Sequence, residues 1–330
     1  MNYVFPIDDP SRVGEVRRAA DSIARGEGLD DANRANLALV VTEVCTNVWK
    51  HAGGGEVYLT KLSDRLSTPG VEILGVDRGP GMSNIRDCLK DGYSTSNTAG
   101  TGLGAISRLS ANWDIYSESG RGTVVMARVT PVSSSEIVVG GVVKPITGED
   151  VSGDGWAARE NDGELTVMVA DGLGHGIMAA RASAEAAAAF RGSNGSKPGA
   201  VLYDIHRALR GTRGAAVAVM QLTHADRTIS FAGLGNIGGV IAAPGKSQSM
   251  ISHAGTAGYG TPRIQEFSYQ VPEAGLIIMH SDGLTTSWTF DSYPGLHRRN
   301  PSLIAAVLCR DATRGRDDTC VVAIRPKEHA

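Results

Sequence analysis

The sequence predicts two different α+β domains that meet near residue 131. Its length of 330 residues suits two domains, because one domain usually has about 100–200 residues. Helical and strand-like segments share the first part, whereas strand-like runs dominate the second. Hydrophobic residues make up 42 % and charged residues 20 % of the chain, as in ordinary globular proteins. We expect domains at residues 1–131 and 137–330, joined by a small, polar linker at 132–136.

In the first part, apolar residues at helical spacing predict two helices, and three strand-like runs and a short helix follow. The expected elements are helices at Ser11–Arg25, Asp31–His51 and Gly102–Leu109, and strands at Glu56–Leu62, Val71–Asp77 and Thr123–Val129.

In the second part, seven apolar runs predict strands, and three segments predict helices, one of them rich in alanine. The expected strands are Ile137–Val143, Leu165–Asp171, Ala215–Leu222, Thr228–Ala232, Gly238–Ala242, Leu276–Ser281 and Cys320–Arg325, and the expected helices are Ile177–Phe190, Pro198–Leu209 and Pro301–Arg310. The glycine-rich stretch Gly233–Gly239 lies between two strand-like runs without a following helix, so we interpret it as a hairpin and not as a phosphate loop.

Charge and cysteine usage exclude several classes of protein. The net charge is −3 and no run of Lys or Arg is present, so nucleic acid is not an expected partner. The four cysteines lie far apart, which favours reduced thiols over a zinc site or a disulfide framework. The N-terminus lacks the features of a signal peptide, and no apolar stretch approaches the length of a membrane span. We expect a soluble, cytoplasmic protein with no membrane partner.

The first chemical motif lies late in the second expected helix. Glu43 and Asn47 are four residues apart and therefore project from one face, which also carries Lys50 and His51. An acid, an amide and basic groups on one stripe suit a ligand. A solvated helix face is an equally good interpretation of this motif alone.

Two glycine motifs follow in order. Asp77 ends a strand, and Gly79 and Gly81 let the chain turn close to a flat ligand. A carboxylate at that point can accept a hydrogen bond from an exocyclic amine.

The other glycine motif runs from Gly100 through Thr101 and Gly102 to Gly104 and leads into a helix. Backbone N–H groups at such a helix start suit phosphates. Each glycine motif is weak evidence by itself.

The order and spacing of the three motifs resemble the GHKL ATPase/kinase superfamily over residues 1–130. Residues 91–96 (DGYSTS) are similar to the bacterial anti-sigma-factor and RsbT-type switch serine kinases. The resemblance implies a Bergerat α/β sandwich that binds ATP with Mg²⁺. It also implies site roles: Asn47 for Mg²⁺, Asp77 for the adenine amine, Gly79 and Gly81 for the base pocket, Gly100, Thr101, Gly102 and Gly104 for the phosphates, Lys50 and His51 as further nucleotide-binding candidates, and Glu43 as the general base.

In the second part, four acidic motifs occur beside glycine or small residues at predicted strand ends. They contain Asp154, Asp171, Asp282 and the pair Asp317–Asp318. Carboxylates at the ends of buried strands repel one another unless cations gather them. Oxygen ligands favour Mg²⁺ or Mn²⁺ over zinc. One such motif is more often an ordinary turn, but four make coincidence improbable.

The order of these motifs resembles the metal-dependent PPM phosphatases, in the SpoIIE/RsbX branch, over residues 136–326. The resemblance implies a β-sandwich flanked by helices and two Mn²⁺ or Mg²⁺ ions. Asp171 would bridge the ions and the Gly172 carbonyl would bind one of them, with Asp154, Asp282 and Asp317 completing the ligands. The implied reaction is in-line attack of metal-activated water on phosphoserine or phosphothreonine.

Some details of this second site stay open in the sequence. Asp318 is the less favoured ligand of the pair Asp317–Asp318. No arginine can be assigned to the substrate phosphate. His175 could act as an acid, although packing in a turn is the preferred interpretation.

Together the motifs predict a bifunctional regulator of a partner-switching or stressosome-type pathway. The first domain would phosphorylate, and the second dephosphorylate, a Ser or Thr of a STAS-type antagonist protein. A downstream sigma factor or switch protein and a homodimer are further expected partners. Two alternatives stay open: a phosphatase whose first domain only binds nucleotide or a partner, and a non-enzymatic scaffold.

Overall fold

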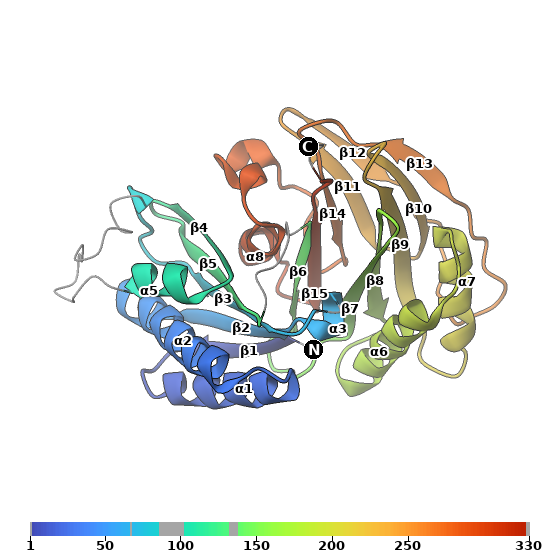
Figure 1. Cartoon of the computed structure of the whole chain (residues 1–330). Helices are drawn as coiled ribbons and strands as arrows, with labels where there is room; N and C mark the ends of the chain where they lie inside the picture. Colours follow the sequence, from blue (N-terminus) through green and yellow to red (C-terminus); the bar gives the residue numbers. More distant parts are fainter. Residues whose placement is uncertain (1, 67, 86–101, 132–137, 328–330) are drawn as a thin grey trace. The chain divides into compact units, whose positions relative to one another are not determined.

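The computed structural model describes residues 2–66, 68–85, 102–131 and 138–327. The chain divides into two compact units, Met1–Glu136 and Ile137–Ala330, and each unit is described by itself (Figure 1). No helix within the described ranges is long and apolar enough to span a membrane.

The first unit is an antiparallel five-stranded sheet with the order β1-β2-β3-β5-β4. Its strands are β1 (Asn2–Ile7), β2 (Gly55–Lys61), β3 (Val71–Asp77), β4 (Asn112–Glu118) and β5 (Gly122–Val129). Its helices are α1 (Arg12–Gly26), α2 (Asp31–Ala52), the single turn α3 (Ser63–Leu66) and α5 (Gly102–Leu109).

Helices α1, α2 and α5 cover one face of this sheet (Figure 1). Successive side chains of a strand point to opposite faces, and alternate residues such as Val57 and Leu59 on β2 join the core with Val40 and Val44 of α2. Helix α2 begins where the Asp30 side chain accepts a hydrogen bond from the backbone N–H of Asn33. The core therefore fixes α2 on the sheet. It thereby also fixes the position of Glu43 and Asn47, which lie on α2.

The second unit is a sandwich of two antiparallel five-stranded sheets with helices outside (Figure 1). One sheet has the order β13-β10-β9-β8-β7 and the other β12-β11-β14-β15-β6. The strands are β6 (Val139–Lys144), β7 (Asp154–Asn161), β8 (Glu164–Gly172), β9 (Ala215–Thr223), β10 (Thr228–Leu234), β11 (Gly238–Ala243), β12 (Lys246–Met250), β13 (Phe267–Gln270), β14 (Leu276–His280) and β15 (Thr319–Ile324). The helices are α6 (Ile177–Gly192), α7 (Pro198–Ala208) and α8 (Pro301–Ala312), with two 3-10 turns at Phe290–Ser292 and Leu296–Arg298.

Small residues let the layers of the second unit approach closely. A methyl group added at Gly172, at the end of β8, would lie 2.2 Å from the Ala179 carbonyl oxygen of α6, and one added at Gly153 would lie 2.7 Å from the Ala179 side chain. On the same helix the Ser183 hydroxyl donates to the Gly153 carbonyl. The alanine-rich helix predicted from the sequence thus packs directly on the strand ends that carry Asp154 and Asp171.

The structure adds strands that the sequence did not indicate: β1, β4, β7, β12 and β13. It also corrects the hairpin expected at Gly233–Gly239. Strands β10 and β11 belong to different sheets, because β10 pairs with β9 and β13 whereas β11 pairs with β12 and β14. The glycines carry the chain from one sheet to the other, and at Gly235 (φ +98°) an added methyl group would lie 2.5 Å from the Ala216 side chain.

The role of Asp30 as the N-terminal cap of α2 can be tested by substitution. Replacing Asp30 with Ala removes the acceptor for the Asn33 N–H, and we expect the local stability of α2 to fall by about 1 kcal/mol. Hydrogen-exchange mass spectrometry of peptides from residues 31–52 measures the change. The control is Asp31→Ala, because the Asp31 side chain is 98 % exposed and forms a surface ion pair with Arg34, which contributes little to stability. Equal exchange in the two variants would contradict the capping role.

Candidate functional site: an aspartate cluster and a polar helix face

Four predicted aspartates come together at one edge of the second unit. Asp154 begins β7 and lies directly opposite Asp171 near the end of β8. Asp282 follows β14, and Asp317 precedes β15, which pairs with β14. The Asp171 carboxyl is close enough to Asp282 and Asp317 for their charges to raise its pKa. Two sheets thus contribute carboxylates to a single cluster.

Burial and mutual repulsion dominate the electrostatics of this cluster. Asp154 is only 6 % exposed, and burial, followed by the charge of Asp171, raises its pKa well above the ordinary value. Burial, followed by the charges of Asp282 and Asp317, raises the pKa of Asp171 to about 7. Within the described part of the chain, no Lys, Arg or His forms an ion pair with any of the four carboxylates. Among the described residues, the cluster therefore has no paired cation to offset its charge.

Divalent cations fit this arrangement. Carboxylates without a paired protein cation are oxygen ligands of the kind that Mg²⁺ and Mn²⁺ prefer. Among the described residues, no group of three or more His, Cys, Asp or Glu side chains is gathered tightly enough to hold a metal ion as it stands. The four aspartates thus lie within electrostatic range of one another without forming a preassembled set of ligands, as expected of carboxylates that repel one another.

Two polar residues that the sequence analysis missed orient these carboxylates. The Ser281 hydroxyl donates to Asp154 Oδ2 at 2.6 Å and accepts a hydrogen bond from the Cys320 N–H. The Asn236 amide donates to Asp282 Oδ2 at 2.6 Å. Ser281 directly precedes Asp282, which was a usable signal. Asn236 lies in the stretch interpreted as a hairpin, and only the crossing between sheets brings it to the cluster.

The pair Asp317–Asp318 divides into two environments. Asp318 is buried, and its carboxylate accepts from the Ile146 N–H at 2.7 Å and the Gly153 N–H at 2.6 Å. Burial still raises its pKa. Asp317 is exposed, and within the described part of the chain it accepts only from the neighbouring Asp318 N–H. Asp318 therefore fastens the loop before β7, and this supports the preference for Asp317 as the metal ligand.

His175 is not packed into a turn. Its side chain is 64 % exposed, and Nδ1 lies 2.7 Å from Glu149 Oε1. The preferred sequence interpretation is wrong because Glu149, from a segment 26 residues earlier, pairs with the imidazole. This pair links the loop after β8 to the segment before β7.

In the first unit, three predicted residues come together. A methyl group added at Gly102, the first residue of α5, would lie 2.9 Å from Glu43 Oε2 and 3.5 Å from Asn47 Oδ1. The Asn47 Nδ2 atom is buried and has no hydrogen-bond partner in the described part of the chain. A buried amide without a partner is costly, and the absence of a side chain at Gly102 lets the start of α5 lie close beside it. Both observations fit a nucleotide with Mg²⁺.

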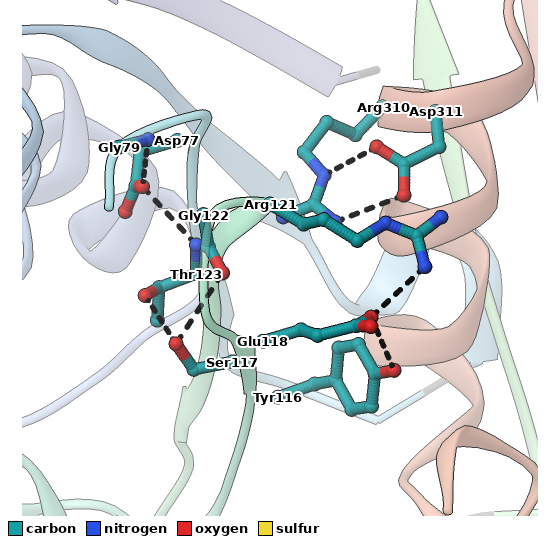
Figure 2. Close-up of polar contacts among 10 residues, drawn as sticks. All are labelled: Asp77, Gly79, Tyr116, Ser117, Glu118, Arg121, Gly122, Thr123, Arg310 and Asp311. Carbon is teal, nitrogen blue, oxygen red and sulfur yellow. Dashed lines mark hydrogen bonds and ion pairs between the residues drawn. The ribbon is translucent and has the colours of Figure 1, made fainter. Parts of the chain in front are cut away.

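The Asp77 turn is built around backbone hydrogen bonds (Figure 2). Asp77 Oδ1 accepts from the Gly79 N–H at 2.8 Å and the Thr123 N–H at 3.1 Å. A methyl group added at Gly79 would lie 2.6 Å from the Ala52 side chain at the end of α2, and one added at Gly81 (φ +68°) would lie 2.1 Å from the Glu118 carbonyl oxygen. The glycines thus hold the turn against α2 and β4.

The remaining predicted residues of this site are more scattered. Lys50 and His51 are exposed in the last turn of α2, and Gly104 is buried in the first turn of α5. Gly100 and Thr101 lie outside the described residues, as does the similar segment 91–96.

Comparison with known proteins identifies both units. Residues 161–327, just over half of the chain, match the family "Stage II sporulation protein E (SpoIIE)". The chain belongs to the SpoIIE family. Residues 7–129 of this SpoIIE-family chain match the family "Histidine kinase-like ATPase domain". The predicted family membership of both parts and the predicted fold class are confirmed.

Individual relatives match part of the chain. Serine/threonine-protein kinase RsbT of Bacillus subtilis (strain 168) is 31 % identical over 112 residues, which are 34 % of this chain and 84 % of RsbT. Phosphoserine phosphatase RsbX of the same organism is 23 % identical over 138 residues, which are 42 % of this chain and 69 % of RsbX. A solved structure described as "The bacterial stressosome: a modular system that has been adapted to control secondary messenger signaling" is 26 % identical with a TM-score of 0.54, and the match covers 58 % of this chain and all of that one.

The raised pKa of Asp171 predicts how the metal-free SpoIIE-family chain responds to pH. The folded carboxyl titrates at about 7 instead of 3.8, so the folded state binds its proton more tightly than the unfolded state does. The stability of the second unit should therefore fall as the pH rises from 3.8 to about 7. Thermal unfolding in a chelator across this range measures the fall, and Asp171→Asn, which cannot ionise, should reduce it. An unchanged pH slope in Asp171→Asn would contradict the assignment.

Proposed function

We propose that this SpoIIE-family chain hydrolyses phosphoserine or phosphothreonine on a protein, in a reaction that depends on divalent metal ions. One observation carries the proposal: four carboxylates meet at one edge of the second unit, and no described cation of the protein pairs with them. The similarity to a phosphoserine phosphatase supports the same reaction.

In the proposed site, the carboxylates of Asp154, Asp171, Asp282 and Asp317 and the Gly172 carbonyl would hold two Mn²⁺ or Mg²⁺ ions. When bound, the ions would activate water and neutralise the substrate phosphate. Ser281 fixes the orientation of Asp154 through its 2.6 Å hydrogen bond, and Asn236 does the same for Asp282. The buried backbone of β7 and β8 keeps the carboxylates in place without the ions.

We further propose that the first unit phosphorylates the same kind of protein. Glu43 and Asn47 lie beside Gly102 at the start of α5. Asn47 would hold Mg²⁺, and Glu43 would accept the proton of the acceptor hydroxyl, as general-base catalysis of phosphoryl transfer requires. Asp77, Gly79 and Gly81 would face the base, and Gly100, Thr101, Gly102 and Gly104 the phosphates, with Lys50 and His51 at the edge of the site. The similarity to a serine/threonine-protein kinase supports this assignment.

The proposed substrate is a STAS-type antagonist protein of a partner-switching or stressosome-type pathway, with a sigma factor or switch protein downstream. A homodimer of this chain belongs to the same proposal. The similarity of one unit to a kinase and of the other to a phosphatase supports a switch that runs in both directions on one substrate. The alternative is a phosphatase whose first unit only binds nucleotide or a partner.

The phosphatase proposal predicts that Asp171→Asn abolishes metal-dependent phosphate release. The change removes a carboxylate that two metal ions would share, so the rate should fall by at least about a hundredfold. Release of phosphate from a Ser-phosphorylated STAS protein and from an aryl phosphate, with Mn²⁺ or Mg²⁺, measures this effect.

The matched control for phosphate release is Glu43→Gln, which changes a carboxylate of the first unit and should leave release intact. Wild-type protein that binds Mn²⁺ but releases no phosphate from either substrate would overturn the proposal and favour the scaffold.

The kinase proposal predicts that Glu43→Gln stops transfer of labelled phosphate from ATP to the unphosphorylated STAS protein while ATP still binds. The amide cannot accept the proton of the serine, and such a loss usually costs about 10²–10⁴ in rate. The assay is run with Asp171→Asn in the background, so that hydrolysis does not erase the label.

Two controls separate kinase turnover from nucleotide sensing. Asn47→Ala should lose ATP binding as well as transfer, because Asn47 would hold Mg²⁺. ATP binding without any transfer in the Asp171→Asn background would support the nucleotide-sensing alternative.

A further inference from the structure

An arginine that no sequence motif singled out lies beside the loop that follows Asp171. Arg213 lies in the loop between α7 and β9. In the sheet, Gly172 lies opposite Ala215, and the Leu173 N–H donates to the Gly214 carbonyl at 3.1 Å. The loop that carries Arg213 is therefore fixed beside the loop that follows Asp171.

The guanidinium group of Arg213 reaches the loop that follows Asp171. A methyl group added at Gly174 would lie 3.2 Å from an Arg213 guanidinium nitrogen. The Gly174 carbonyl oxygen would in turn lie 3.2 Å from a methyl group at Gly153, which directly precedes Asp154. The positive charge thus lies along the rim formed by Gly153 and Gly174, next to the strand ends that carry Asp154 and Asp171.

The backbone around Arg213 is held independently of the arginine side chain. The Thr212 hydroxyl donates to the Leu209 carbonyl at 2.8 Å and accepts from the Gly214 N–H at 2.9 Å. Ala215 exchanges two backbone hydrogen bonds with Ala257, at 3.1 and 2.8 Å. Substitution of the side chain should therefore leave the loop in place.

Arg213 is exposed and makes no hydrogen bond or ion pair with any residue in the described ranges, although a cluster of carboxylates lies at the same edge. Two other arginines of this unit, by contrast, are engaged: Arg159 donates to three backbone carbonyls, and Arg325 donates to carbonyls of residues 297–299. An unpaired guanidinium on a fixed loop beside the aspartate cluster suits an anion that binds there.

We propose that Arg213 binds the phosphate group of the substrate at the aspartate cluster. This inference rests on the proposed phosphatase function. Guanidinium presents parallel N–H donors that match two phosphate oxygens, which an ammonium group cannot do. Arg213 thus supplies the phosphate contact for which the sequence offered no arginine, and it acts from the loop before β9.

The test compares Arg213→Ala and Arg213→Lys with wild-type protein loaded with Mn²⁺. In Arg213→Ala, KM for an aryl phosphate and the inhibition constant of inorganic phosphate should both rise by roughly ten- to a hundredfold. Arg213→Lys should recover only part of the loss, because it keeps the charge without the paired donors. Mn²⁺ affinity, measured by calorimetry, should stay within about twofold of wild type in all variants, since the arginine ligates no metal.

The matched control is Lys246→Ala, which also removes one exposed positive charge. Lys246 pairs with Ala243 at one end of β11. The aspartate cluster lies toward the other end of β11, where Gly238 pairs with His280, two residues before Asp282. Its KM and inhibition constant should equal those of wild type.

Two results would overturn the inference, and each is distinct from a failure of the phosphatase proposal. Unchanged KM and phosphate inhibition in Arg213→Ala, with an active wild type, would exclude Arg213 as the phosphate ligand. A wild type without turnover would contradict the phosphatase function. Calorimetric binding of inorganic phosphate to the Mn²⁺-loaded protein would then decide on Arg213 alone: binding weakened in Arg213→Ala supports the inference, and equal binding excludes it.

Discussion

Repulsion among buried carboxylates is the constraint on which the second unit depends. Asp154 and Asp171 face each other across paired strands, and burial raises the pKa of both. The surrounding structure holds them there: Ser281 donates to Asp154, and the Ala179 turn of α6 packs directly on Gly153 and Gly172. Any side chain at these glycines would push α6 away from the strand ends. The small residues of this region are therefore a consequence of keeping the cluster compact.

In the first unit, apolar packing likewise holds polar groups in place, here the side chains of Glu43 and Asn47. Its helix α2 is fixed by a buried core on one side and carries Glu43 and Asn47 on the other. The Asn47 amide is buried without a partner among the described residues, beside the bare Gly102. Packing energy from the core keeps this polar group in place before any ligand arrives. In both units, strong apolar packing supports polar groups that are poorly satisfied by the protein alone.

Much of this arrangement could be predicted from the sequence, and the failures share one cause. Strong apolar periodicity indicated α2, β3, β8 and β14, and the aspartates at strand ends indicated the cluster. Asn236 and Arg213 were not predicted as site residues, because their roles depend on which strands pair. The glycine stretch at 233–239 has the local pattern of a hairpin, yet it crosses between sheets. Pairing over long distances is fixed by packing of the whole sandwich and leaves no local pattern at either residue.

Polar groups held in advance of their ligands connect stability with binding in this chain. Cations that bind the folded cluster, and not the unfolded chain, stabilise the fold by an amount that grows with the logarithm of their concentration once this exceeds the dissociation constant. The same linkage applies to a nucleotide beside Asn47. Asp171 lies near the end of β8, and β8 pairs with β9, which follows the loop of Arg213. Ligand binding at the aspartate cluster should therefore make this edge of the sheet more rigid. Each unit is thus expected to be most rigid when its own ligand is bound, and this is the physical basis on which two opposing reactions could be regulated separately within one chain.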